Sequence, residues 1–242
     1  MQSLRDALTD VEQKRQDLVV YAESDEQARQ ILTQFSTKNV DVTTRSLPVD
    51  SPGFVILRDE DEAFSGAMGL DHFESMLSPD LRPPWALDPA EWAIVNDGFR
   101  FLENTLFSSF DRSHMLVAAR EIEERAWRLG VGTLFVGFQR ADAYEAQRSM
   151  YNRIVSETNL TVKIFIDEQW SAPTHEQIHV FDNAGDEIGK YWILIYDGGE
   201  SDLQKCGLLA EERKPGEYFG FWTYDPERVD AIITYLEREY EV

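Results

Sequence analysis

The chain has little of what several protein classes need. Its 242 residues include one cysteine, Cys206, which rules out a disulfide framework and a four-cysteine zinc site. No apolar run reaches the roughly 18 residues of a membrane-spanning helix. The first residues, MQSLRDALTDVEQKR, are polar and amphipathic and do not look like a signal peptide. We therefore expect a soluble cytoplasmic protein that has no membrane partner.

Motifs of the common nucleotide-binding and hydrolytic enzymes are also missing. Gly198-Gly199 lies outside any G-x-x-x-x-G-K-[ST] pattern, and Gly130 and Gly132 do not begin a G-x-G-x-x-G turn. There is no G-x-S-x-G, and Cys206 has no evident base partner for a nucleophilic role. The sequence identifies no cofactor or chromophore, and we predict a protein that is not an enzyme.

Lysine is scarce, and the charge is strongly negative. Acidic residues number 45 and basic residues 23, six of them lysine, which gives a formal net charge of −22. Such a surface is typical of a halophilic cytoplasm, because the Debye length in molar salt is only ~3 Å and like charges then repel little. Nucleic acid is not expected as a partner, since DNA binding needs Lys and Arg to neutralise phosphates.

The composition otherwise suits a folded protein with a sizeable core. Hydrophobic residues make up 43% of the chain and aromatic residues 12%, which argues against disorder despite the charge. A chain of this length forms one large domain or two small ones.

The stretch Ser113–Arg140 is the most informative. Five apolar residues recur at steps of four and three, which makes one stripe on a helix: Met115, Ala119, Ile122, Ala126 and Leu129. Glu and Arg stand four apart on its other faces, as Glu121–Arg125 and Glu124–Arg128. Ser113 is a suitable N-cap, and Gly130 stands where a helix needs a left-handed residue after its end.

The period then changes to that of a buried strand. Thr133–Phe138 is a short and almost wholly apolar run, Arg140–Ser156 is helical again, and Thr161–Asp167 is another β-branched and aromatic run. Helix, strand, helix, strand predicts parallel pairing of the two strands in an α/β fold. We expect a mixed β-sheet with flanking helices.

Ahead of this stretch, residues 1–80 predict a small N-terminal α/β lobe, in the order helix, strand, helix, three strands, helix. Ser78–Pro84 holds three prolines and reads as a linker. Asp88-Pro89-Ala90-Glu91 is typical of a helix start, and this helix is expected to end near Phe107.

C-terminal to Thr161–Asp167, short apolar runs follow one another at roughly ten-residue spacing, which predicts an antiparallel meander. Asp225-Pro226-Glu227 repeats the helix-start chemistry before a last amphipathic helix. The strand candidates are Ile178–Phe181, Trp192–Tyr196, Lys205–Glu211 and Tyr218–Thr223.

The segment AAREIEERAWRLGVGTLFVGFQR resembles the core of the DICT domain, a sensory module. The matching positions are Arg120-Glu121, Glu124-Arg125-Ala126, Gly132 and Gly137-Phe138-Gln139, with further likeness at Tyr191-Trp192 and Gly220–Pro226. The likeness is to stand-alone versions from salt-loving archaea and implies a DICT-like domain over residues 85–242. It also implies a part in signalling, including light-responsive signalling, and it does not name a ligand.

Charged residues at the matching positions have two interpretations. In one, Arg120, Glu121, Glu124 and Arg125 form a solvated helix face laced with ion pairs. In the other, they fix the helix against Gln139 or a pocket, because a small-molecule site needs only a few polar groups among aromatic walls. The hypothetical ligand-binding set is Arg120, Glu121, Glu124, Arg125, Gln139 and Trp192.

His175-Glu176-Gln177-Ile178-His179 is a literal H-E-x-x-H. On a helix it would hold zinc through His175 and His179, with Glu176 as general base of a hydrolase. A strand would separate the two histidines by roughly 13 Å, too far to share one ion. Pro173 before the motif and the turn residues after it favour a loop and a strand.

Together these features predict a non-enzymatic cytoplasmic sensory protein that binds a small ligand or a regulator. The resemblance implies that its state passes to a separate transcription regulator or kinase. The alternatives are a zinc-dependent hydrolase using HEQIH and a structural interaction module without a ligand. The oligomeric state stays open, a homodimer included.

Overall fold

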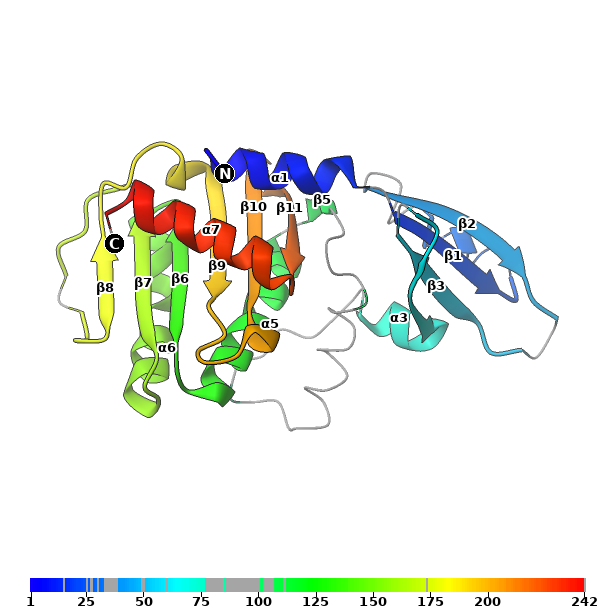
Figure 1. Cartoon of the computed structure of the whole chain (residues 1–242), viewed down its shortest axis with the longest axis horizontal. Coiled ribbons are helices and arrows are strands. Elements are labelled where there is room, and N and C mark those ends of the chain that lie inside the picture. Colours follow the sequence, from blue (N-terminus) through cyan, green and yellow to red (C-terminus); the bar gives the residue numbers. More distant parts are fainter. Residues whose placement is uncertain are drawn as a thin grey trace.

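Two β-sheets organise the chain in this computed structural model, which describes residues 1–14, 16–24, 26, 28–29, 31–32, 39–48, 51–59, 61–76, 85, 101, 107–110, 112–172 and 174–241. The smaller sheet has the order β2-β1-β3-β4, and the larger has the order β5-β11-β10-β9-β6-β7-β8 (Figure 1). The smaller sheet consists of β1 Gln16–Ala22, β2 Val40–Ser46, β3 Phe54–Arg58 and β4 Phe64–Gly69. The larger consists of β5 Phe107–Phe110, β6 Thr133–Phe138, β7 Thr161–Ile166, β8 Ile178–Phe181, β9 Tyr191–Tyr196, β10 Cys206–Lys214 and β11 Glu217–Thr223.

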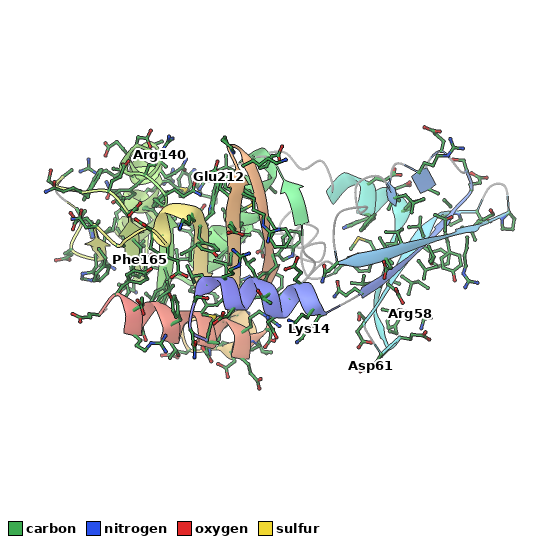
Figure 2. The ribbon with its side chains drawn as sticks, turned by 90° about the horizontal axis from the view of Figure 1, so that it is seen from above. Lys14, Arg58, Asp61, Arg140, Phe165 and Glu212 are labelled. Carbon is green, nitrogen blue, oxygen red and sulfur yellow. The ribbon has the colours of Figure 1, made fainter. Side chains whose placement is uncertain are left out.

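Helices cover both faces of the larger sheet. Helices α5 and α6 lie on one face, and α1 and α7 lie side by side on the other (Figures 1 and 2). The predicted fold class, a mixed α/β sheet with flanking helices, is confirmed. The described helices are α1 Leu4–Gln13, α3 Leu70–Met76, α5 Arg112–Leu129, α6 Ala141–Glu157 and α7 Pro226–Glu239, with 3₁₀ turns η2 Ile188–Lys190 and η3 Asp202–Gln204.

Strand β6 lies inside the larger sheet, antiparallel to β9 and parallel to β7. Its side chains alternate between two cores, because successive residues of a strand point to opposite faces. Leu134 and Val136 belong to the core under α5 and α6, whereas Phe135 belongs to the core under α1 and α7. The predicted buried strand and its parallel partner are confirmed.

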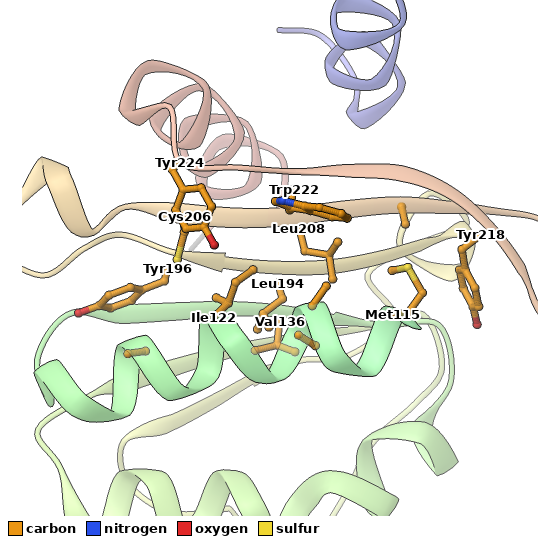
Figure 3. Packing of buried hydrophobic residues seen from close by; sticks show 14 of the residues in the cluster. Met115, Ile122, Val136, Leu194, Tyr196, Cys206, Leu208, Tyr218, Trp222 and Tyr224 are labelled. Atoms are coloured by element: carbon orange, nitrogen blue, oxygen red, sulfur yellow. The ribbon is translucent and has the colours of Figure 1, made fainter. Parts of the chain in front are cut away.

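Helix α5 packs its apolar stripe on this sheet (Figure 3). Met115, Ile122 and Ala126 are at most 2% exposed, as the periodicity predicted. The helix begins at Arg112, one residue before the predicted cap Ser113, and ends at Leu129, which is 40% exposed and so forms the edge of the stripe.

The order of the later strands differs in part from the prediction. Strands β9, β10 and β11 form the expected antiparallel meander. Strand β8 instead pairs in parallel with β7 at the edge of the sheet. The strand spacing was therefore right, and the pairing partner was wrong.

The N-terminal helix α1 packs away from the strands that follow it. Its buried residues Leu4, Leu8 and Val11 share a core with those of α7. Glu187 accepts a hydrogen bond from the Leu4 amide at 2.9 Å, and Arg228 Nη1 donates to Asp10 at 2.5 Å. Helix α1 therefore stabilises the larger sheet, although the sequence grouped it with residues 1–80.

Two further expectations fall on parts of the chain that are not described. The linker Ser78–Pro84 and the helix expected from Asp88 to Phe107 lie almost wholly outside the described residues. The second helix of the N-terminal lobe, which the capping residue Ser24 predicts to run to about Asn39, is described only at residues 24, 26, 28–29, 31–32 and 39. The division into domains at 1–80 and 85–242 stays a prediction.

Two glycines after α5 offer a test of why the chain turns there. Both have positive φ, +69° at Gly130 and +96° at Gly132. A Cβ on Gly132 would stand 2.7 Å from Gly199 Cα, whereas one on Gly130 would have its nearest neighbour at 3.8 Å. We expect Gly132→Ala to lower the free energy of unfolding by about 2–4 kcal/mol. The matched control Gly130→Ala should lose about 1–2 kcal/mol from the backbone alone. Equal losses in denaturant melts would contradict the crowding at Gly132.

Candidate functional site

Helix α5 carries several charged residues that are buried. Glu121 is 3% exposed, Glu123 2%, Glu124 0% and Arg125 2%. The interpretation as a solvated face is therefore wrong for Glu121, Glu124 and Arg125. Glu123 contacts Tyr151 of α6, whereas Arg125, paired with Glu121, contacts Gln204 and Tyr224 on the other flank of the helix.

On the flank toward α6, Arg120 is the centre of a hydrogen-bonded network. Arg120 Nη2 donates to Gln147 Oε1 at 2.6 Å, and Arg120 Nη1 pairs with the Glu123 carboxylate. Tyr151 donates its hydroxyl to Glu123 Oε1 at 2.6 Å. Burial raises the pKa of Glu123, while Arg120 and Tyr151 oppose that shift. This network ties α5 to α6.

On the opposite flank, Arg125 ties α5 to the far strands. Its Nη2 donates to Glu121 Oε1 at 2.8 Å and its Nη1 to Gln204 Oε1 at 3.1 Å. The guanidinium carbon lies 4.9 Å from the centre of the Tyr224 ring. Burial is the largest single influence and would lower the pKa of Arg125, but Glu121, Cys206 and Tyr224 together outweigh it and the pKa rises. Arg125 therefore stays charged in the interior.

Glu124 points away from the sheet, since it stands two positions from both Ile122 and Ala126 on the helix. It is nevertheless fully buried. Arg128 donates to its Oε1, and within the described part of the chain its Oε2 has no hydrogen-bond partner. Burial raises the pKa of Glu124 from 4.5 to about 7.

A small cavity of about 40 Å³ lies where β6 ends. Gln139 and Trp192, two of the predicted ligand-binding residues, both line it. Tyr218 adds an edge-to-face contact with Trp192, with ring centres 5.6 Å apart. The Gln139 Nε2 atom is buried and has no acceptor among the described residues. The cavity thus combines aromatic walls with an unpaired amide donor.

Among the lining residues of this cavity that sequence reasoning missed, Gln147 has the clearest role. Gln147 of α6 lines it and also accepts the hydrogen bond from Arg120. The signal that could have found it is its place on the same face of α6 as Ala143, one turn earlier. Gln147 is the link between the cavity and the charged network of α5.

The predicted set is therefore distributed over three places. Gln139 and Trp192 line the cavity, and Arg120 reaches it through Gln147. Glu121 and Arg125 pair on the other flank of α5. Glu124 lies on the outward face of the helix.

The HEQIH segment does not form the helix that a zinc protease site needs. His175 precedes a turn at Glu176-Gln177, and His179 lies within β8. His175 Nδ1 accepts a 3.3 Å hydrogen bond from the Gln177 amide. In the described ranges, no three His, Cys, Asp or Glu side chains are grouped to hold a metal ion. The zinc alternative loses its structural basis, and the loop and strand favoured by the sequence are confirmed.

Comparison with known proteins identifies the central part of the chain. Residues 101–213 match the family model of DICT, a sensory domain in diguanylate cyclases and two-component systems. This segment is a DICT domain. The match spans β5, α5, β6, α6, β7, β8, β9 and most of β10, and so contains the Arg120 network, the Glu121–Arg125 pair and most of the cavity wall. Strand β11 and helices α1 and α7 complete the same sheet and its cover outside the matched residues.

Comparisons with curated proteins and with solved structures add no functional information. No curated protein matches the chain. Among solved structures, a polyphosphate kinase from Porphyromonas gingivalis aligns with a TM-score of 0.38 and 11% sequence identity, over 98% of this chain and 48% of that one. The chain spans about half the length of that kinase, and so distant a likeness carries no functional argument.

The buried pair of the DICT domain can be tested against an exposed one. Glu121→Ala leaves the Arg125 charge buried without its carboxylate, so the free energy of unfolding should fall by about 3–5 kcal/mol. Glu157→Ala is the control, because Glu157 pairs with Arg153 at 2.8 Å but the two side chains are 41% and 46% exposed. Its loss should be at most about 1 kcal/mol. Similar losses of unfolding free energy for the two variants in denaturant titrations would argue against a buried Glu121–Arg125 ion pair.

Glu124 predicts a pH dependence of stability. Its pKa is about 7 in the folded protein against an ordinary 4.5, so the folded state holds this proton more tightly than the unfolded chain. Stability is then greatest below pH 4.5 for this group, falls as the pH rises, and levels off above about 7. The expected total is up to about 3 kcal/mol. Glu124→Gln removes this titration, so the variant should gain stability relative to the wild type between pH 5 and about 8. Parallel pH profiles of the two proteins would contradict the buried carboxyl.

Proposed function

We propose that this protein is a non-enzymatic sensor that binds a small ligand in the cavity beside Gln139 and Trp192. The DICT match supports a sensory role in general. The cavity supports the finer assignment to a small ligand, because aromatic walls and a few polar groups are typical of such sites.

One observation carries the proposal. Gln147 lines the cavity and at the same time accepts a 2.6 Å hydrogen bond from Arg120 of α5. A ligand that moves or reorients Gln147 acts directly on Arg120, and through Glu123 on the packing of α5 against Tyr151. The cavity and the main helix of the domain therefore share one set of hydrogen bonds.

The response is a shift between two packings of α5. A ligand can bias such an equilibrium only by the difference between its affinities for the two states. The buried charges make intermediate positions of the helix unfavourable, since an Arg or Glu pulled from its partner is left unpaired in the interior. Helix α5 is thus suited to move between discrete positions.

We further propose that the protein acts in the cytoplasm of a halophile and passes its state to a regulator or kinase in trans. The net charge of −22 suits molar salt. Among the helices that are described, none is both long enough and apolar enough to cross a membrane. Homodimerisation stays an open part of this proposal.

A ligand screen with two readouts tests the proposal. A metabolite library is screened by thermal shift in molar KCl, where a ligand at 100 times its Kd adds ~2.7 kcal/mol to stability. A true ligand should slow hydrogen exchange of the α5 amides. Gln139→Leu should abolish both effects, and Gln147→Leu should uncouple α5 exchange from binding because it removes the acceptor of Arg120.

Glu145→Gln is the control, because Glu145 is on the same helix as Gln147 but its side chain is 55% exposed. It should keep both the thermal shift and the α5 response. A ligand that stabilises the wild type and Gln139→Leu equally, or that leaves α5 exchange unchanged, would overturn the proposal.

A further inference from the structure

The polar groups of the cavity narrow the chemistry of what it can hold. We propose that it binds a carbonyl or carboxylate oxygen, held by the side-chain amides of Gln139 and Gln147. The inference rests on the proposed function, since it names the ligand class of the same cavity.

Gln139 supplies an unused donor. Its Nε2 is buried and finds no acceptor among the described residues, although an amide nitrogen carries two N–H donors. A buried donor left unpaired costs about 1–3 kcal/mol. An oxygen brought by a ligand recovers that hydrogen bond, whereas a ligand that only donates does not.

Gln147 is held in one orientation by its neighbour. Arg120 can only donate hydrogen bonds, and its Nη2 lies 2.6 Å from the Gln147 side-chain amide. The oxygen of that amide must therefore face Arg120, and its NH₂ group must face the other way. Since Gln147 lines the cavity, this NH₂ group is available as a second donor to an oxygen bound there.

The surroundings disfavour a cation. The lining residues include no Asp or Glu, although the chain has 45 acidic residues. The nearest charge in the network is the Arg120 guanidinium, one hydrogen bond away from the lining residue Gln147. Two amide donors beside an arginine match an acceptor, and there is no counter-charge for an ammonium group.

The size of the cavity sets how much of the ligand it encloses. Its volume is about 40 Å³. A single water needs roughly 10–15 Å³ on this scale, so the space takes a head group of about three non-hydrogen atoms. A carboxylate or a primary amide is of that size. The rest of a larger ligand would lie outside, against the rings of Trp192 and Tyr218.

The side-chain amides themselves can report binding. The full chain labelled with ¹⁵N is titrated, at constant ionic strength, with acetate, acetamide and methylammonium, and the side-chain NH₂ signals are followed by NMR. The signals of Gln139 and Gln147 should shift saturably with acetate, acetamide or both, and the comparison of these two separates carboxylate from neutral carbonyl. Gln177 is the internal reference, since its Nε2 already donates to Leu160 O at 3.1 Å. Methylammonium should shift none of the three.

A matched pair of variants decides between binding and a general charge effect. Gln139→Glu keeps the size of the side chain but replaces the donor by a carboxylate, so acetate affinity should fall at least about tenfold, or 1.4 kcal/mol. Gln13→Glu makes the same charge change on the exposed end of α1 and should leave the affinity unchanged.

The NMR titrations distinguish a wrong ligand class from a wrong binding site. Saturable binding of methylammonium at Gln139 and Gln147, without response to acetate or acetamide, would overturn the ligand class and leave the site standing. No response of either glutamine to any of the three probes would overturn the ligand class. If the library screen also yields no ligand that depends on Gln139, the proposed function falls as well.

Discussion

The structure depends on the buried ion pairs that hold α5 in place on both of its flanks. Its apolar stripe is used against the sheet, and polar side chains tie its two flanks to Gln147 of α6 and to Gln204 ahead of β10. Arg120 with Glu123 serves the first flank, and Arg125 with Glu121 the second. Each buried charge requires its partner in place. Apolar packing would tolerate rotation of the helix, and these directional pairs do not.

The position of the cavity follows from the strand order. Strand β6 ends between a parallel neighbour, β7, and an antiparallel one, β9, and the helices on either side of β6 in sequence, α5 and α6, pack on the same face. In α/β sheets, ligands bind in the crevice beyond the carboxyl ends of the strands. Gly137, Phe138 and Gln139 end β6 at this point and line the cavity. Gly137-Phe138-Gln139, one of the stretches that resemble the DICT core, thus forms part of the cavity wall.

The sequence predicted what depends on local periodicity. The stripe through Ile122 and Ala126, the turn at Gly130 and the buried run Thr133–Phe138 all follow from side-chain spacing along the chain. Burial of Glu121 and Arg125 could not be read in this way, because an i,i+4 pair has the same spacing in water and in the interior. The pairing partner of β8 could not be predicted either, since the spacing of apolar runs indicates where a strand lies in the sequence and not which strand it pairs with. Gln147 shares a face of α6 with Ala143, but its hydrogen bond to Arg120 could be found only once α5 and α6 were placed together.

One face of the larger sheet is covered by helices outside the DICT match, which indicates how much of the chain folds together with the matched segment. Phe135 and Ile193 point to that face, and they are buried by α1 and α7, which lie outside residues 101–213. A fragment ending at the match would lose α7 and β11 and expose a row of large apolar side chains to water. We infer that the folding unit includes α1, so that the chain leaves the larger sheet at Lys14, directly before β1. Hydrogen bonds from the Leu4 amide to Glu187 and from Arg228 to Asp10 hold α1 in this position.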